Sequence, residues 1–172
     1  MNEVIRALIS RRSVRSYNDK KVPAELVKEI VEAGTYAPSG SGSQASKMVV
    51  IRDETLVKEL SQMNAAVGGM TNDPFYGAKT IVVVFSDSQK ATCVENGALV
   101  MANLMNAAYS VGVCSCWIHR AREVFETDRG KALKEKWGVP STYIGIGHCI
   151  LGYSDMPIPE AAPRKEDYYY FA

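Results

Sequence analysis

The sequence lacks the features that mark several simple functional classes. Its formal net charge is only +1, so we expect no strongly basic face and no nucleic-acid partner. It has no run of about 18 consecutive apolar residues, which argues against a membrane partner. The N-terminal stretch MNEVIRALIS contains an acidic residue and no long apolar run, so it is not typical of a secretory signal.

Recognisable metal and nucleotide motifs are also missing. The four cysteines include no CxxC pair, and only His119 and His148 could add imidazole ligands, so a zinc site is poorly supported but stays open. We favour buried, reduced thiols in a cytoplasmic protein, because a free cysteine behaves as a small hydrophobic residue. Neither GxGxxG nor GxxxxGK[ST] occurs, which disfavours a Rossmann or P-loop fold.

Length and hydrophobic periodicity predict one domain over residues 1–172. A short amphipathic helix is expected over residues 4–9, and Pro23 and Gly34 are placed to begin and end a second helix. Further helices are expected over 54–62, 93–111 and 128–137, with strands over 47–52, 80–85 and 143–151. Strands and helices do not alternate regularly, so the pattern predicts a layered α+β fold with one sheet.

A basic stretch, Arg11-Arg-Ser-Val-Arg-Ser-Tyr17, follows the first predicted helix. If it runs extended, Arg11, Ser13 and Arg15 point the same way, because side chains alternate along an extended chain. Two guanidinium groups and a hydroxyl would then converge, which suits a phosphate. The alternative is a solvated basic helix end, where arginine is also favoured.

A second unusual stretch, Tyr36 to Ser46, has almost no bulky side chains. Its glycines and hydroxyls let the backbone approach a ligand closely and supply hydrogen-bond donors. Such a composition is also typical of linkers. A linker here would leave an N-terminal part of roughly 35 residues, too small to fold alone, so we favour a functional loop.

The helix expected over 93–111 is apolar on most sides, which predicts a place in the core or in an interface. Asn96, Asn103, Asn106 and Ser110 recur along one side of it and need hydrogen-bond partners if buried. A ligand, a partner subunit and bonds within the chain are all open. The aromatic terminus Tyr168–Phe171 is expected to dock, either on its own core or on a second subunit.

Four motifs occur together and in order between Ile5 and about Lys165. They are Arg-Arg-Ser-x-Arg before an aromatic residue, Ala-Pro-Ser-Gly before a glutamine, Val-Gly-Val-Cys-Ser-Cys-Trp, and Ile-Leu-Gly-Tyr before prolines and a basic residue. In this combination the chain resembles the short members of the FMN-dependent nitroreductase family. The resemblance implies an α+β fold in which helices flank one central, mostly antiparallel sheet.

The same resemblance implies a homodimer with FMN sites at the interface, each built from both chains. NAD(P)H would reduce the flavin, and an electron-poor acceptor such as a nitroaromatic or a quinone would then be reduced by a ping-pong mechanism. The family carries no dedicated catalytic acid or base for this step, since the cofactor performs the chemistry. The alternative is a flavin-binding sensor or carrier with little turnover.

The resemblance also implies which residues bind FMN. Arg11, Arg12 and Ser13 match phosphate and ribityl contacts, Arg15 a basic residue beside flavin N1 and O2, and Arg164 a C-terminal phosphate contact. Pro38, Ser39, Gly42 and Gln44 match the loop that reaches the ring from the other subunit, and Ser115, Cys116 and Trp117 match a segment passing near the cofactor.

The chain departs from the family pattern at three positions. Gly42 stands where many relatives have asparagine, so only a backbone contact is expected from it. Ser46 stands where a tryptophan-like ring is common, which predicts a more open pocket or a differently packed loop. Lys79 stands where proline is common, and we attach no functional expectation to it.

Overall fold

The computed structural model describes all residues 1–172 and contains six α-helices and four strands. The helices are α1 (Glu3–Ser10), α2 (Ala24–Thr35), α3 (Glu54–Gly68), α4 (Cys93–Ser110), α5 (Ala121–Glu126) and α6 (Asp128–Lys136). The strands are β1 (Ser46–Ile51), β2 (Thr80–Asp87), β3 (Cys114–Ile118) and β4 (Tyr143–Gly152).

The strands form one sheet in the order β1-β2-β4-β3, and every neighbouring pair is antiparallel. The predicted α+β class with one antiparallel sheet is therefore confirmed. Strand β2 is buried from Thr80 to Ser86, as its unbroken apolar sequence predicts for a strand covered on both faces.

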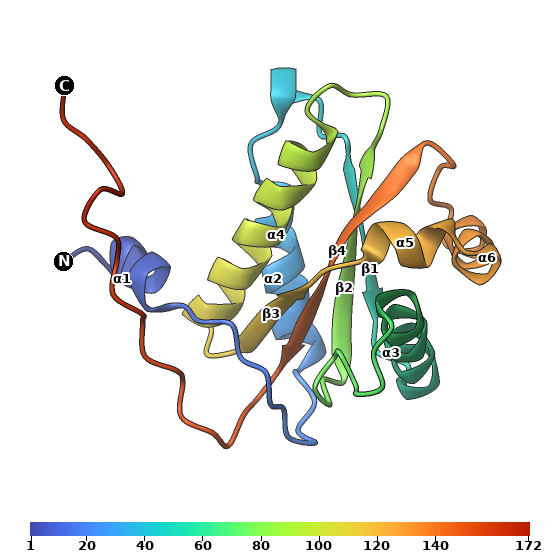
Figure 1. Ribbon diagram of the computed structural model, residues 1–172, viewed down its shortest axis with the longest axis horizontal. Coiled ribbons are helices and arrows are strands. Elements are labelled where there is room, and N and C mark those ends of the chain that lie inside the picture. Colours follow the sequence, from blue (N-terminus) through green and yellow to red (C-terminus); the bar gives the residue numbers. More distant parts are fainter.

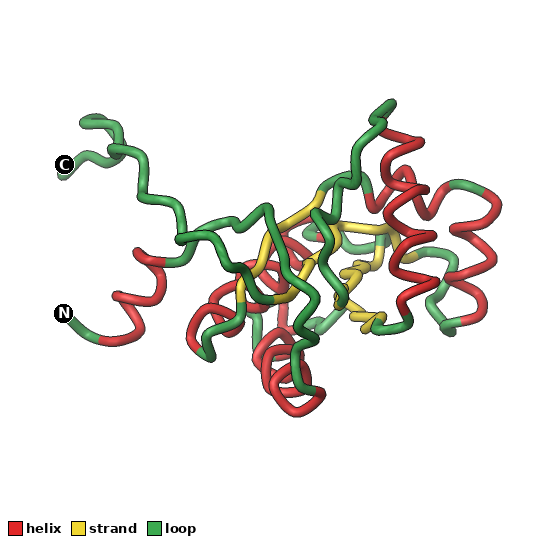
Figure 2. Tube along the Cα trace, turned by 90° about the horizontal axis from the view of Figure 1, so that it is seen from below, coloured by secondary structure: helices red, strands yellow, loops and turns green.

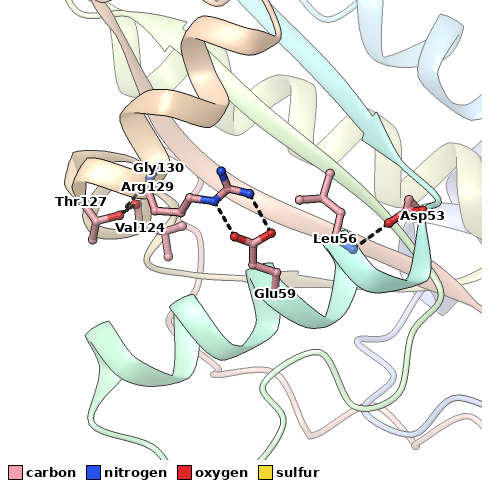
Figure 3. A network of polar contacts seen from close by, with 7 residues as sticks. All are labelled: Asp53, Leu56, Glu59, Val124, Thr127, Arg129 and Gly130. Carbon is pink, nitrogen blue, oxygen red and sulfur yellow. Dashed lines mark hydrogen bonds and ion pairs between the residues drawn. The ribbon is translucent and has the colours of Figure 1, made fainter.

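Helices cover both faces of the sheet (Figure 1). Helices α2 and α4 pack with Val82, Val84 and Leu151 on one face, while α3, α5 and α6 enclose a second apolar cluster on the other. On that second side a bidentate pair between Arg129 of α6 and Glu59 of α3 links the two helices at the surface (Figure 3).

Several element boundaries differ from those predicted. Strand β3 and helix α5 have no predicted counterpart, because both are short and β3 begins Cys-Ser-Cys, with large apolar residues only at its last two positions. Helix α3 continues to Gly68. Pro23 caps α2 instead of lying inside it, and Gly34 lies within the helix. An added Cβ at Gly34 would lie 3.0 Å from atoms of Leu104 and Met48, so this glycine serves close packing, not termination.

The N-terminal helix and the C-terminal segment project together from one side of the sheet layers (Figure 2). Helix α1 buries no residue, and the exposed fractions of its apolar residues Val4, Ile5, Leu8 and Ile9 range from 50% to 67%. The aromatic terminus is exposed as well, so it does not dock on its own core. None of the helices combines the length and apolar character that crossing a bilayer requires.

Candidate functional site

The basic stretch after α1 runs extended along β3. The Val14 N–H donates to the Ser115 carbonyl oxygen over 3.1 Å, and Ser13 and Ser115 form a parallel bridge. Val14 is 6% exposed, so its side chain fixes the segment to the edge of the sheet. The extended conformation is confirmed, and the alternative of a solvated helix end is not.

A cavity of about 70 Å³, the arginine cavity, lies where this segment meets the end of α4, the start of β3 and the C-terminal tail. Its lining residues are Arg11, Arg12, Val14, Tyr109, Gly112, Val113, Cys114, Ser115 and Ile158. Arg11 Nη1 and Arg12 Nε are buried without a hydrogen-bond partner in the chain. No carboxylate lines the cavity, so its donors are left for an anion.

The groups beside this cavity do not cancel its positive charge. Burial raises the pKa of Cys149 to about 12, and the nearby Arg11 guanidinium opposes that shift only in part. Burial likewise raises the pKa of Tyr17 well above its usual range. Both groups are therefore neutral at pH 7, and the two arginines set the local potential.

Of the remaining residues in the basic stretch, only some lie beside the cavity. Arg12 lines the cavity beside Arg11, although side-chain alternation along an extended chain would point the two residues in opposite directions. The alternation begins only after Arg11, because Arg11 is the C-terminal cap of α1. Arg12 Nη1 donates to the Ile9 and Arg11 carbonyl oxygens, each over 2.7 Å. Ser13 does not line the cavity, and Arg15 is exposed.

The predicted C-terminal phosphate contact does not join this group within the chain. Arg164 is exposed, and its guanidinium donates only to the Ala162 carbonyl oxygen. Ile158, in the same tail, does line the arginine cavity.

The Ser/Gly-rich stretch is a tight, tethered loop, not a linker. Ser39 Oγ accepts from the Gln44 N–H over 3.0 Å, and the Gly40 N–H donates to Asn96 Oδ1 over 2.9 Å. Gly42 has a φ of +65° and nothing within 4 Å of an added Cβ, so its backbone is open to an approaching group. Asn96, which the sequence marks only as a member of the polar stripe on α4, anchors the loop.

The arginine cavity and this loop lie at opposite ends of α4. The cavity adjoins Tyr109 in the last turn of the helix and Gly112 just beyond it, while the loop is tethered to Asn96 in the first turn. Helix α4 has 18 residues, which corresponds to a length of about 27 Å. One chain therefore cannot bring both groups to the same part of one small ligand.

Of the three β3 residues predicted near a cofactor, only Ser115 adjoins the arginines. Cys116 is 1% exposed and belongs to the core on the α3 and α5 side, so only its backbone can reach a ligand. The Trp117 indole packs on Gly147, where an added Cβ would come within 2.3 Å of Nε1. It lines a different cavity, with His119 and Arg120.

Comparison with known proteins shows to which family the chain belongs. The Nitroreductase family pattern matches residues 8–153. The chain is 34% identical over 167 residues to an NADH dehydrogenase of Thermus thermophilus, covering 92% of this chain and 74% of that protein. It is 28% identical over 159 residues to an Archaeoglobus fulgidus protein provisionally named NADH dehydrogenase/NAD(P)H nitroreductase, covering 89% and 86%.

A crystal structure of a Bacteroides fragilis nitroreductase with bound FMN superimposes on the whole of both chains. The TM-score is 0.91 and the sequence identity 26%. The layered fold and its antiparallel sheet therefore match those of a flavin-bound relative. The chain belongs to the Nitroreductase family.

Proposed function

We propose that the chain is an FMN-dependent oxidoreductase that takes hydride from NAD(P)H and reduces a small electron-poor acceptor, such as a nitroaromatic or a quinone. The observation that supports this proposal most directly is the arginine cavity, where buried guanidinium N–H groups of Arg11 and Arg12 have no partner in the chain. A phosphate would satisfy both, because arginine pairs with phosphate through short, charge-assisted hydrogen bonds.

The size of this cavity limits what it can hold. About 70 Å³ accommodates a group of phosphate size, whereas pockets for whole ligands are typically about 300–1,000 Å³. Arg11 and Arg12 would thus hold the phosphate end of FMN, with Ser115 at its edge, and the ribityl chain and ring would lie outside. When bound, FMN supplies the ring that accepts and donates hydride, so reduction and reoxidation alternate at one site in a ping-pong cycle.

Arg15 is the residue of this segment best placed for the ring. It is exposed, and it follows the arginine cavity along the same extended stretch. Its positive charge beside flavin N1 and O2 would stabilise the negative charge that accompanies flavin reduction. Ser13, on the same stretch, would contact the ribityl portion.

The remaining part of the site would come from a second copy of the chain. The loop residues Pro38, Ser39, Gly42 and Gln44 lie one helix length from the arginine cavity, so in a homodimer they would complete the flavin site of the partner. Arg164, exposed in the projecting tail, would reach the phosphate only in such an assembly.

The exposed apolar surface supports that homodimer. The apolar face of α1 is solvent-exposed, and Tyr168 to Phe171 are between 72% and 90% exposed. Apolar surface of this extent on projecting segments is typical of an interface, because its burial is the main favourable term in association. A second copy would cover both segments at once.

The function is tested by anaerobic titration of the purified protein. We expect bound flavin with absorption near roughly 450 nm, and we expect NADH or NADPH to bleach it before added acceptor restores it. Flavin that binds but is not reduced would identify a carrier or sensor. Protein that refuses added FMN would refute both functions.

The ring contact is tested with Arg15→Ala. We expect weaker FMN binding and slower flavin reduction, because the variant removes the positive charge proposed to face the reduced ring. Arg122→Ala, an exposed arginine on α5, is the matched control and should change neither. If the two variants bound FMN equally tightly and their flavin were reduced equally fast, the assignment of Arg15 to the site would be wrong.

Dimerisation is tested with Ile5→Asp, which places a charge on the exposed apolar face of α1. We expect light scattering to show monomers and FMN to be lost together with the dimer. Val67→Asp changes an exposed valine on α3 and serves as the control. A wild-type monomer that binds one FMN tightly would contradict the two-chain site.

A further inference from the structure

A second small cavity lies directly behind the tethered loop. Its volume is about 150 Å³, and it is enclosed by the end of α2, the loop, the start of β1 and the first half of α4. The residues that matter here are Ser39 and Gln44 of the loop, Ser46 and Met48 of β1, and Asn96 and Val100 of α4. No lining side chain is ionisable, so the cavity suits a neutral group.

Asn96, one of the lining residues, holds an unused hydrogen-bond donor. Its side chain is 2% exposed, and Oδ1 faces the Gly40 N–H at 2.9 Å, which fixes the orientation of the amide. The other end, Nδ2, is buried and has no partner in the chain. A buried donor without a partner is unfavourable, so an oxygen acceptor beside it would be bound favourably.

The loop that walls the cavity is held in one position. An added Cβ at Gly40 would come within 2.3 Å of Thr92 Oγ1, so the loop backbone lies tightly against the start of α4. Ser41 and Gln44 have positive φ values of 54° and 47°, conformations that persist only where the surroundings hold them. The cavity is therefore a preformed feature of the loop.

We propose that this cavity binds a benzene-sized ring that bears a hydrogen-bond-accepting oxygen, and that it takes this part of the electron acceptor. Volumes near 150 Å³ are known to hold one benzene. Asn96 Nδ2 would donate to the oxygen, Met48 and Val100 would contact the ring, and the reducible group would remain outside beside the loop. Ser46 leaves the space open because its side chain is small.

This inference rests on the proposed function, since the loop is the one assigned to the flavin of the partner. Binding is tested on the oxidised, FMN-loaded protein by ligand-observed NMR with anisole, which has a ring and an acceptor oxygen, and with toluene, which lacks the oxygen. We expect anisole to bind at least about tenfold more tightly than toluene, corresponding to one hydrogen bond of roughly 1.4 kcal/mol.

Asn96→Asp isolates the donor, because its carboxylate can still accept from the Gly40 N–H but has no N–H to offer. We expect this variant to lose the preference for anisole over toluene. Ser46→Trp fills the cavity and should abolish binding of both. Val50→Trp, on the exposed part of the same strand, is the control that should bind as wild type does.

Turnover separates this inference from the proposed function. With 4-nitroanisole as acceptor, Ser46→Trp should raise KM about tenfold or more, whereas reduction of the ring-free acceptor ferricyanide should be unchanged. If ferricyanide is reduced but neither anisole binding nor the KM responds to Ser46→Trp or Asn96→Asp, the cavity is not a ligand pocket. If NAD(P)H never reduces the bound flavin, it is the proposed function that fails. If Ser46→Trp does not fold, the preference for anisole over toluene, compared between wild type and Asn96→Asp, still tests whether the cavity binds the ligand.

Discussion

His148 makes the stability of this fold depend on pH in a way that can be measured. It is completely buried in β4, with the rings of Phe75 and Phe125 at centroid distances of 5.2 and 6.0 Å. Asn64 Nδ2 lies 3.5 Å from Nδ1, and Nε2 has no partner. Burial lowers the pKa of His148 to about 4, although the backbone carbonyls of Ile118 and His119 oppose this shift.

The size and sign of the effect follow from linkage. The unfolded chain binds a proton to this imidazole near pH 6.5, whereas the folded chain does so only near pH 4. Between these values the unfolded state holds more protons, so stability falls as the pH is lowered and the loss is complete near pH 4. The whole window corresponds to about 3 kcal/mol, and the part between pH 7 and pH 5 to about 2 kcal/mol.

Urea denaturation followed by circular dichroism at pH 7 and pH 5 measures this loss. The carboxylates of Glu54 and Glu59 do not interfere, because their ion pairs lower their pKa values and they titrate below this range. His148→Gln should remove most of the difference in unfolding free energy between the two pH values. His119→Gln, which removes the exposed histidine, should retain it. A wild-type difference below about 0.5 kcal/mol, or one that His148→Gln leaves intact, would refute the reasoning.

Three further substitutions test the packing and surface contacts by denaturant titration. Gly130→Ala should destabilise by about 3 kcal/mol, because its Cβ would lie 2.1 Å from the Val124 carbonyl oxygen and backbone cannot move aside cheaply. Leu104→Ala should cost about 2–5 kcal/mol, since this fully buried side chain fills the space between α4, α2 and the sheet. Arg129→Gln should cost less than about 1 kcal/mol and nothing at high salt, because its pair with Glu59 is solvent-exposed (Figure 3).

The parts of the fold with strong periodicity were predictable from the sequence. Strand β2 and helix α4 match their predicted ranges closely, because a β-branched apolar run and a long apolar helix each allow few alternatives. Strand β3 has no predicted counterpart, because its five residues, Cys-Ser-Cys-Trp-Ile, lack a regular polar and apolar alternation and gain their strand conformation from pairing with β4. Tertiary pairing decided that segment, not local preference.

The sequence singles out Arg11 and Arg12 as candidate site residues, but it does not predict that the structure groups them in one cavity. Alternation placed Arg11 with Ser13, yet the structure places Arg11 with Arg12, because the helix cap at Arg11 resets the direction of the side chains. The partner of Val14 on β3 could not be read from the sequence, since that bridge joins residues about a hundred positions apart. The free donor of Asn96 could not be predicted either, because the contact with Gly40 decides which end of the amide is left without a partner.

Helix α4 connects these observations. It packs its apolar residues Val100, Met101 and Leu104 on the sheet, and that packing fixes where both of its ends lie. At one end the turn through Gly112 leads into β3, which holds the arginine stretch; at the other end Asn96 holds the loop. The separation of the arginine cavity from the loop is therefore set by the length of a core helix. In the proposed homodimer, a twofold axis would bring the arginine cavity of each chain to the loop of the other, so the same pairing would occur twice.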